Sequence, residues 1–399
     1  MSSEEKKLFK TLEILLTYSV CSYVVLIFVS KGEGLRNILL FGSLFLWILT
    51  IKRGEIANFF RSPLTFLYIL FVSFCFISVL YSLDPVYSID AMREDFIKGV
   101  ILFPIIATTF NSEEKLKKIS SAFALSALIL VANGYVSYLT GGVTVFKPDT
   151  KIVHLWHNQF ARHLNSLLPF IFSLLFFSKR RAARILLFCL LLFSVLGLIF
   201  STSRGGYVSF ISMMVVWVLF LTKERQVHLK KVIAVVSLIA MLAVVFSFTS
   251  VPYIRDRITT FESIILRFHV WIPVIEAIKE RPVFGWGFGP KMIRKEEPYL
   301  NTPHKPPQRG VHNTFLKIAF TTGVVGLTSY LSLLIYAILF CLRNARKEGA
   351  RNFGSFMFVS VLSVIIGNYF FHSMIELVSF LSLSILLGIA LASEKRNRN

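Results

Sequence analysis

The chain has 399 residues, of which 55% are hydrophobic and only 16% are charged, and its mean hydropathy is +0.68. One water-soluble core cannot bury so much apolar side chain, so the composition excludes an ordinary soluble enzyme. The formal net charge of +21 could suit a nucleic-acid-binding protein, but such proteins gather basic residues on one folded face. Here the basic residues are distributed from loop to loop, and we expect no nucleic-acid partner.

Apolar runs long enough to cross the ~30 Å hydrocarbon core of a bilayer recur along nearly the whole sequence. They predict an all-α polytopic integral membrane protein with about twelve transmembrane helices. The expected spans are residues 11–29, 37–51, 64–83, 97–111, 118–139, 164–178, 184–200, 206–222, 231–250, 314–341, 353–371 and 374–393. The fourth and sixth are short. The first lacks a small-residue cleavage site at its flank, which favours a retained span over a signal peptide.

Lys and Arg residues collect in the short cytoplasmic loops of membrane proteins. In this chain basic clusters precede the first expected span and follow every second one to the C-terminus. Both termini are therefore expected on the cytoplasmic side. The chain then divides into residues 1–250, with nine spans and short loops, residues 251–313, a large and partly helical outer loop, and residues 314–399, with three spans and a cytoplasmic tail.

A second group of basic residues falls on the expected outer side, against the usual charge bias. They are Arg204, Arg255, Arg257, Arg267, Lys291, Arg294, Lys295, Lys305 and Arg309. Topology does not account for them, whereas an anionic ligand outside the membrane would. The outer segments long enough to form a site for such a ligand are residues 84–97, 140–163 and 251–313.

A polar island with the sequence Ser-Thr-Ser-Arg-Gly-Gly covers residues 201–206, between two expected spans. Its glycines let the backbone approach a ligand closely. The helix expected to begin near Gly206 points free N–H groups and the positive end of its dipole outward, and the guanidinium fork of Arg204 suits phosphate oxygens. These features favour an anion-binding cradle. The alternative is a plain turn whose arginine extends to the lipid headgroups.

Residues 262–281 have the pattern of an amphipathic helix. Its polar face carries Glu262, His269, Glu276 and Glu280. Arg267 lies roughly opposite, among apolar residues that include Trp271, and a cation on such a face costs about 2.5–3.5 kcal/mol at membrane depth unless it has a partner. That partner is either a phosphate or an internal carboxylate, and the pattern does not decide between them. Pro273 is a position at which this helix could break.

His312 precedes an apolar run, with Asn313 or Thr314 as a suitable N-cap. A helix N-terminus disfavours the imidazolium, which keeps the ring neutral and able to accept a proton. His312 is therefore a candidate general base, although a lone histidine at a helix start is usually just a polar residue near headgroups. Gly323 and Gly326 are expected to serve close helix packing.

Weaker signals concern metal ions, carboxylates and thiols. His154 and His157 have an i, i+3 spacing, but no nearby cysteine or carboxylate pair completes a site, so we expect no metal. Asp90, Glu94 and Asp95 could serve a different lipid-linked sugar transferase, although no Asp-x-Asp motif occurs among them. The cysteines fall within expected spans, where a thiol is usually a small buried hydrophobe, so we expect no disulfide framework. They are Cys21, Cys75, Cys189 and Cys341.

Together these elements resemble a known family. His-Asn followed after nine residues by Gly-x-x-Gly, which begins at His312, resembles the signature of O-antigen ligases. Residues 201–205 look like a motif of the wider O-antigen ligase and polymerase superfamily, and residues 267–287 are similar to its large periplasmic loop. The resemblance extends over roughly residues 150–330 by motif and over the whole chain by topology.

The resemblance implies an inner-membrane enzyme that transfers O-antigen polysaccharide from undecaprenyl pyrophosphate to the lipid A core, on the periplasmic side. It also implies that no metal, cofactor or nucleotide is needed and that the anomeric centre is inverted. Because the pyrophosphate already activates the donor, the protein need only offset its charge and deprotonate an acceptor hydroxyl. Besides donor and acceptor, the lipid bilayer is the expected partner, and the sequence indicates no oligomeric state.

In this interpretation Arg204 and Arg267 hold the pyrophosphate, while His312 takes the acceptor proton. Asn313 would cap the helix or orient the imidazole. The expected substrate-binding residues are Ser201, Ser203, Gly205, Asn313, Trp271, Arg162, Lys98 and Arg93, of which the last three would line the outer cavity.

Three alternatives stay open. An O-antigen polymerase would share the topology and the donor but extend a lipid-linked glycan. A protein O-oligosaccharyltransferase of the same superfamily would accept Ser or Thr, yet such enzymes usually carry additional periplasmic sequence. A transporter of lipid-linked sugars would move its substrate without a covalent product, but transporters typically place charged residues at the bilayer midplane rather than at the outer ends of spans.

Overall fold

The computed structural model describes residues 3–29, 32–141, 146–223, 262–289, 313–348, 352–371 and 377–396. Helices make up most of this part of the chain, and the expected all-α polytopic membrane fold is confirmed. Eight of the described helices are long and apolar enough to cross a membrane. They are α1 (Ser3–Leu26), α2 (Glu33–Thr50), α4 (Pro63–Leu80), α7 (Glu113–Leu139), α8 (His157–Phe177), α9 (Arg181–Phe200), α10 (Arg204–Lys223) and α15 (Thr314–Glu348).

The other described helices are shorter or less apolar. They are α3 (Arg53–Phe60), α5 (Pro85–Ala91), the π-helix η1 (Met92–Phe96), α6 (Ile97–Thr109), α13 (Glu262–Glu280), α16 (Phe353–Val364), the π-helix η3 (Ile365–Phe371) and α17 (Leu377–Arg396). Three further expected spans coincide with α6, with α16 continued by η3, and with α17. The ninth expected span, residues 231–250, lies outside the described residues.

The helices pack closely at the centre of the bundle and expose apolar side chains at its edge. The contact between α6 and α17 depends on glycine, since a Cβ atom added at Gly99 would lie 2.8 Å from Ser384 Oγ. On the outside, Phe45 of α2 and Leu186 of α9 are well exposed. In a membrane protein such side chains face the lipid tails, so hydrophobicity alone does not separate core from surface.

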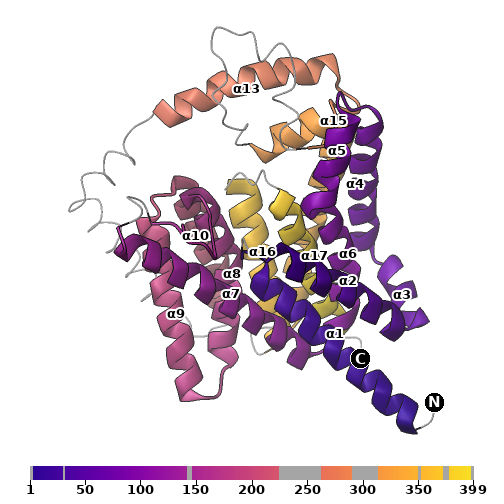
Figure 1. Cartoon of the computed structure of the whole chain (residues 1–399), viewed down its shortest axis with the longest axis vertical. Coiled ribbons are helices and arrows are strands. Elements are labelled where there is room, and N and C mark those ends of the chain that lie inside the picture. The colour runs from indigo at the N-terminus through magenta and orange to yellow at the C-terminus, as the bar shows by residue number, and fades with distance from the viewer. Residues whose placement is uncertain are drawn as a thin grey trace.

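Figure 1 shows how the functional segments lie relative to the bundle. The helix α13 lies across one end of the molecule, at the top of the view, while both chain termini lie toward the opposite end. Next to α13 lie α5 and the part of α15 drawn in orange. The end of the bundle at which α13, α5 and this part of α15 lie is therefore away from the chain termini.

Two helices differ from their predicted form. Pro273 does not break α13, which continues through it from Glu262 to Glu280. By contrast α15 is interrupted at Gly323, whose φ of 70° and ψ of −171° are not helical. Helix packing alone therefore does not describe the role of Gly323, which divides α15 into a first segment, residues 314–322, and a longer second segment.

One prediction about the thiols was wrong. Cys21, Cys75 and Cys341 are buried as expected, but Cys189 is exposed on α9. The face of α9 that carries Cys189 also exposes Ile185 and Leu186, so this thiol lies where lipid would cover the helix. An apolar span has a lipid-facing side as well as a protein-facing side, and composition does not distinguish them.

Candidate functional site

The turn between α9 and α10, which we call the polar turn (Ser201–Ser203), is tight and buried. The three residues are at most 3% exposed. Ser201 Oγ donates to Leu198 O at 2.6 Å, and Ser203 Oγ accepts from the Gly206 backbone N–H at 3.2 Å. Ser203 therefore precedes and caps α10, which begins at Arg204 rather than near Gly206. Arg204, the first helical residue, is half-buried.

Thr202 carries backbone strain at the middle of the polar turn. Its φ is +52°, in the left-handed region that a β-branched residue rarely adopts. Thr202 Oγ1 is buried and has no hydrogen-bond partner among the described residues. The same holds for Asn165 Oδ1 on the neighbouring α8. Buried polar atoms without a partner cost free energy, and such atoms together with backbone strain are typical of functional sites.

The turn is locked against α8 through Gly206. A Cβ atom at Gly206 would lie 2.7 Å from the Cβ of Ala161, and Asn165 Nδ2 donates to Gly206 O at 2.9 Å. Gly205 and Gly206 were both expected to let the backbone approach a ligand closely. At Gly206 the missing side chain instead lets α8 pack closely, whereas Gly205 is half-buried beside Arg204.

A buried amide joins this region to a third helix. Asn368 of η3 donates from Nδ2 to Arg162 O at 3.1 Å and to Ser166 Oγ at 2.7 Å, and its Oδ1 accepts from Ser209 Oγ of α10 at 2.7 Å. The Arg162 side chain is 5% exposed and is buried beside this network rather than in an open outer cavity. The sequence prediction missed Asn165 and Asn368, although amides inside apolar runs were a usable signal.

Two buried tyrosines lead from this network toward α15. Tyr369 of η3 and Tyr330 of α15 are both buried, where η3 packs against α15. The Tyr330 ring lies 6.4 Å from the ring of Phe315, near the start of α15. The start of α15 and the network beside α10 are thus connected through packed side chains.

The start of α15 has the predicted cap. Asn313 Oδ1 accepts from the backbone N–H groups of Phe315 at 3.0 Å and Leu316 at 3.2 Å, so the expected capping role of Asn313 is confirmed. His312 lies outside the described residues. Arg267 lies within α13, but the structure does not describe its side chain.

The described half of α13 packs on the first segment of α15. Val274 and Ala277 of α13 form a small buried cluster with Trp286 and Phe320, and Trp271 packs half-buried against it. Trp271 was expected to bind substrate. In the structure its side chain packs against this cluster.

Other predicted residues lie elsewhere. Lys98 of α6 lies 3.6 Å from the Glu33 carboxylate, and Arg93 of η1 is exposed. Asp90 and Glu94, weighed as alternative catalytic carboxylates, are exposed as well.

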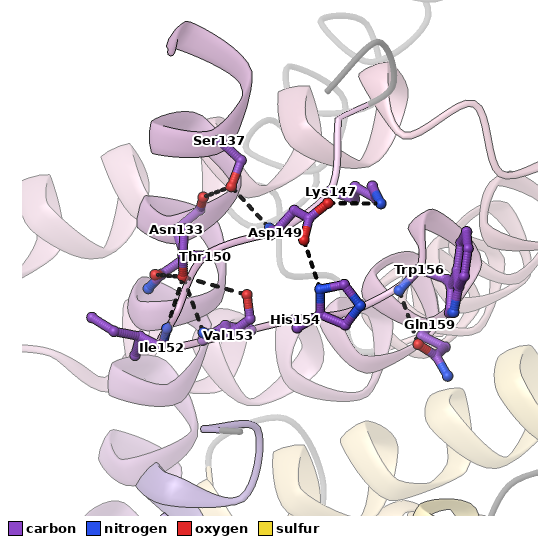
Figure 2. Close-up of polar contacts among 10 residues, drawn as sticks. All are labelled: Asn133, Ser137, Lys147, Asp149, Thr150, Ile152, Val153, His154, Trp156 and Gln159. Carbon is purple, nitrogen blue, oxygen red and sulfur yellow. Dashed lines mark hydrogen bonds and ion pairs between the residues drawn. The ribbon is translucent and has the colours of Figure 1, made fainter. Parts of the chain in front are cut away.

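A second polar cluster lies in the loop of residues 146–156, between α7 and α8 (Figure 2). His154 Nδ1 lies 2.6 Å from Asp149 Oδ1, and Lys147 Nζ lies 3.0 Å from Asp149 Oδ2. Hydrogen bonds from Lys147 and then His154 lower the pKa of Asp149 below its ordinary value. The loop is fixed by Thr150 Oγ1, which donates to Asn133 Oδ1 at 2.7 Å. His154 thus has a carboxylate partner.

The loop also adjoins the polar turn. The Phe146 backbone N–H donates to Phe200 O at 3.4 Å, next to Ser201. The Phe146 ring is fully buried, and Cβ atoms at Gly134 and Gly197 would lie 2.6 Å and 2.9 Å from it. The loop is therefore anchored by one aromatic side chain while its polar cluster stays at the surface.

Fold and site together define a polytopic membrane protein with buried polar groups gathered near helix ends. The family model described as O-antigen ligase matches residues 189–331 of this chain. This match supports membership in the O-antigen ligase and polymerase superfamily, and it suggests a glycosyl-transfer enzyme of that kind. The matched region contains Arg204, Arg267 and His312, whereas Arg162 lies outside it.

The chain is also similar to an uncharacterized protein of Haemophilus influenzae. The two are 22% identical over 371 residues, which cover 86% of this chain and 87% of that protein. The similarity thus extends over most of both chains.

Proposed function

We propose that this protein is an O-antigen ligase. It transfers O-antigen polysaccharide from undecaprenyl pyrophosphate to the lipid A core oligosaccharide, on the periplasmic side of the bacterial inner membrane, with inversion and without metal or nucleotide. The observation that carries the proposal is the buried, strained polar turn that fixes Arg204 at the start of α10, within the region that matches the ligase family.

Arg204 and Arg267 bind the pyrophosphate of the donor. The start of α10 adds the positive end of a helix dipole, which favours an anion there. A guanidinium fork binds phosphate oxygens in a bidentate manner. As the anomeric C–O bond breaks, negative charge grows on the leaving pyrophosphate, and these groups stabilise it. Thr202 Oγ1 and Asn165 Oδ1, which have no partner in the described part of the chain, are available to the polar groups of the donor.

His312 acts as the general base. It precedes Asn313, whose side chain caps α15 and fixes the first turn of that helix. The imidazole removes the proton of an acceptor hydroxyl, the acceptor oxygen attacks the anomeric carbon from the face opposite the pyrophosphate, and the pyrophosphate leaves. General base catalysis of this kind contributes about 10² to 10⁴ in rate.

The decisive experiment mixes purified protein with lipid-linked donor and lipid A core acceptor and measures ligated product. His312→Ala is expected to lower the rate at least about 10²-fold. His154→Ala is the matched control, because His154 lies in the loop of residues 146–156 and has no role in the proposed chemistry. Ligation by His312→Ala at the wild-type rate would contradict the proposed base.

The same assay separates the ligase from its alternatives. With donor alone, a ligase gives no product, whereas an O-antigen polymerase, which the same superfamily includes, gives longer lipid-linked chains. A polypeptide acceptor tests for protein glycosylation. A transporter would move donor across a vesicle membrane and form no covalent product with any acceptor.

A further inference from the structure

We propose that residues 281–289, which we call the strap, are a positioning device for the transfer reaction. The strap holds α13 and the first segment of α15 in one fixed arrangement, and Trp286 and Gly323 are the positioning residues. This inference rests on the proposed function, because α13 carries Arg267 and only Asn313 separates His312 from the first segment of α15.

Backbone hydrogen bonds across the interruption of α15 are the main observation. The N–H groups of Trp286 and Gly287 donate to Phe320 O at 2.8 Å and to Thr321 O at 3.1 Å. In return, the Val324 N–H donates to Pro282 O at 2.7 Å. An uninterrupted helix would satisfy these α15 groups by itself. The strap takes over that pairing, so the direction of the first segment is set by the strap.

Glycine is required on both sides of this contact. A Cβ atom at Gly323 would lie 2.0 Å from Val283 O, and one at Gly285 would lie 2.5 Å from Phe320 O. Both glycines have positive φ values, 70° and 69° respectively. A side chain at either position would collide with backbone that cannot move aside, and it would also strain its own residue. Alanine at Gly323 must therefore separate the strap from α15.

Trp286 connects the strap to both helices. Its Nε1 donates to Ala277 O of α13 at 2.8 Å. Its ring stacks on Phe320 with centroids 6.1 Å apart, and the Arg281 guanidinium lies 4.2 Å from its centroid. The side chain is only 5% exposed. One indole thus fixes the C-terminal half of α13 to the first segment of α15.

The strap is anchored in turn to the corner between α4 and α5. The Leu83 N–H donates to Trp286 O at 3.2 Å, and Ser88 Oγ donates to Phe288 O at 2.7 Å. The rings of Tyr81 and Phe284 stack at 4.7 Å with an interplanar angle of 4°. These contacts tie the strap to the membrane-spanning bundle, so α13 is placed relative to the bundle.

Steady-state kinetics test the device. Displacing reacting groups by about 1 Å can cost about 10²-fold in rate, so Gly323→Ala is expected to lower kcat by about that factor and, because α13 carries Arg267, to raise the KM for donor. Trp286→Phe, which keeps an aromatic ring but loses the bond to Ala277, is expected to lower kcat by about 10-fold. Gly99→Ala, crowded against Ser384 in the bundle, is the matched control for a destabilised fold and is expected to keep kcat per folded molecule.

A distance measurement gives a readout that does not depend on activity. Spin labels at Ile272→Cys on α13 and Thr328→Cys on the second segment of α15, both exposed positions, are introduced with Cys189→Ser to remove the exposed native thiol. The distance distribution is expected to be narrow in the parent and broad in Gly323→Ala and in Trp286→Ala.

The two readouts separate the strap from the chemistry. A narrow distribution in Gly323→Ala, or a kcat loss that Gly99→Ala reproduces at the same melting temperature, would overturn the positioning role. Full activity in both His312→Ala and Arg267→Ala would instead overturn the proposed function, even if the strap variants still broadened the distance distribution.

Discussion

The polar turn and the strap each fix a part of the proposed site, but they are built from different groups. Side chains hold the turn, through Ser203, Asn165 and the amide of Asn368. Backbone atoms hold the strap, through bonds to Phe320 and Thr321. A site made by side chains changes with the chemistry of single residues, whereas a site made by backbone changes with the conformations that glycine allows. Substitutions should therefore act on the two regions in different ways.

Changes to charge should have the largest effect at the polar turn. Arg204→Ala removes the proposed phosphate-binding fork and is expected to lower the ligation rate by about 10²- to 10³-fold, which is typical of losing one group that stabilises developing charge. Arg204→Lys keeps the charge but loses the bidentate geometry, so an intermediate rate is expected. The rate is measured with purified donor and acceptor.

The control for Arg204 is an arginine at the other end of the preceding helix. Arg181, the first residue of α9, is exposed, and Arg181→Ala is expected to leave the rate unchanged. Equal rates for Arg204→Lys and the wild type would argue against bidentate binding, and unimpaired ligation by Arg204→Ala would remove the arginine from the proposal.

The next largest effect is expected on folding stability, at Asn368, whose amide joins η3 to α8 and α10. Asn368→Ala leaves the Ser209 hydroxyl without its acceptor in an apolar interior, which is expected to cost about 1–3 kcal/mol of folding free energy. Asn344→Ala is the matched control, because among the described residues the Asn344 amide donates only to Phe340 O of its own helix, at 2.9 Å. Thermal melting in detergent compares the two, and similar losses would show that Asn368 joins no network.

The difference between the two regions also explains what the sequence could predict. Apolar runs locate most of the described spans, and the turn at residues 201–203 and the Asn313 cap were predicted because each depends on neighbouring residues. The strap was not predicted, because Trp286 and Phe320 are far apart in the sequence and their backbone pairing leaves no local pattern. The exposure of Cys189 was missed because lipid and protein interior select the same side chains.

Some of the missed residues did carry a signal. Asn165 and Asn368 interrupt apolar runs, and an amide in such a run requires a partner. The partner of each could not be deduced, since it depends on which helices pack together. Gly323 likewise matched the family signature, but its spacing from Gly326 suggested packing rather than an interruption of the helix.

The smallest effect is expected in the surface loop of residues 146–156, beside the polar turn. This loop shows how much an exposed polar cluster contributes to stability, for comparison with the buried amides. Hydrogen bonds from Lys147 and His154 lower the pKa of Asp149. The ionised carboxylate therefore contributes stability above the ordinary aspartate pKa of about 3.9. This contribution is lost as the pH falls through the lower folded-state pKa. Asp149 is partly exposed, so Asp149→Asn is expected to cost less than about 1 kcal/mol at neutral pH and to flatten the pH dependence of the melting temperature below pH 4. A loss as large as that of Asn368→Ala would mean that the loop, and not only the buried amides, holds the polar turn in place.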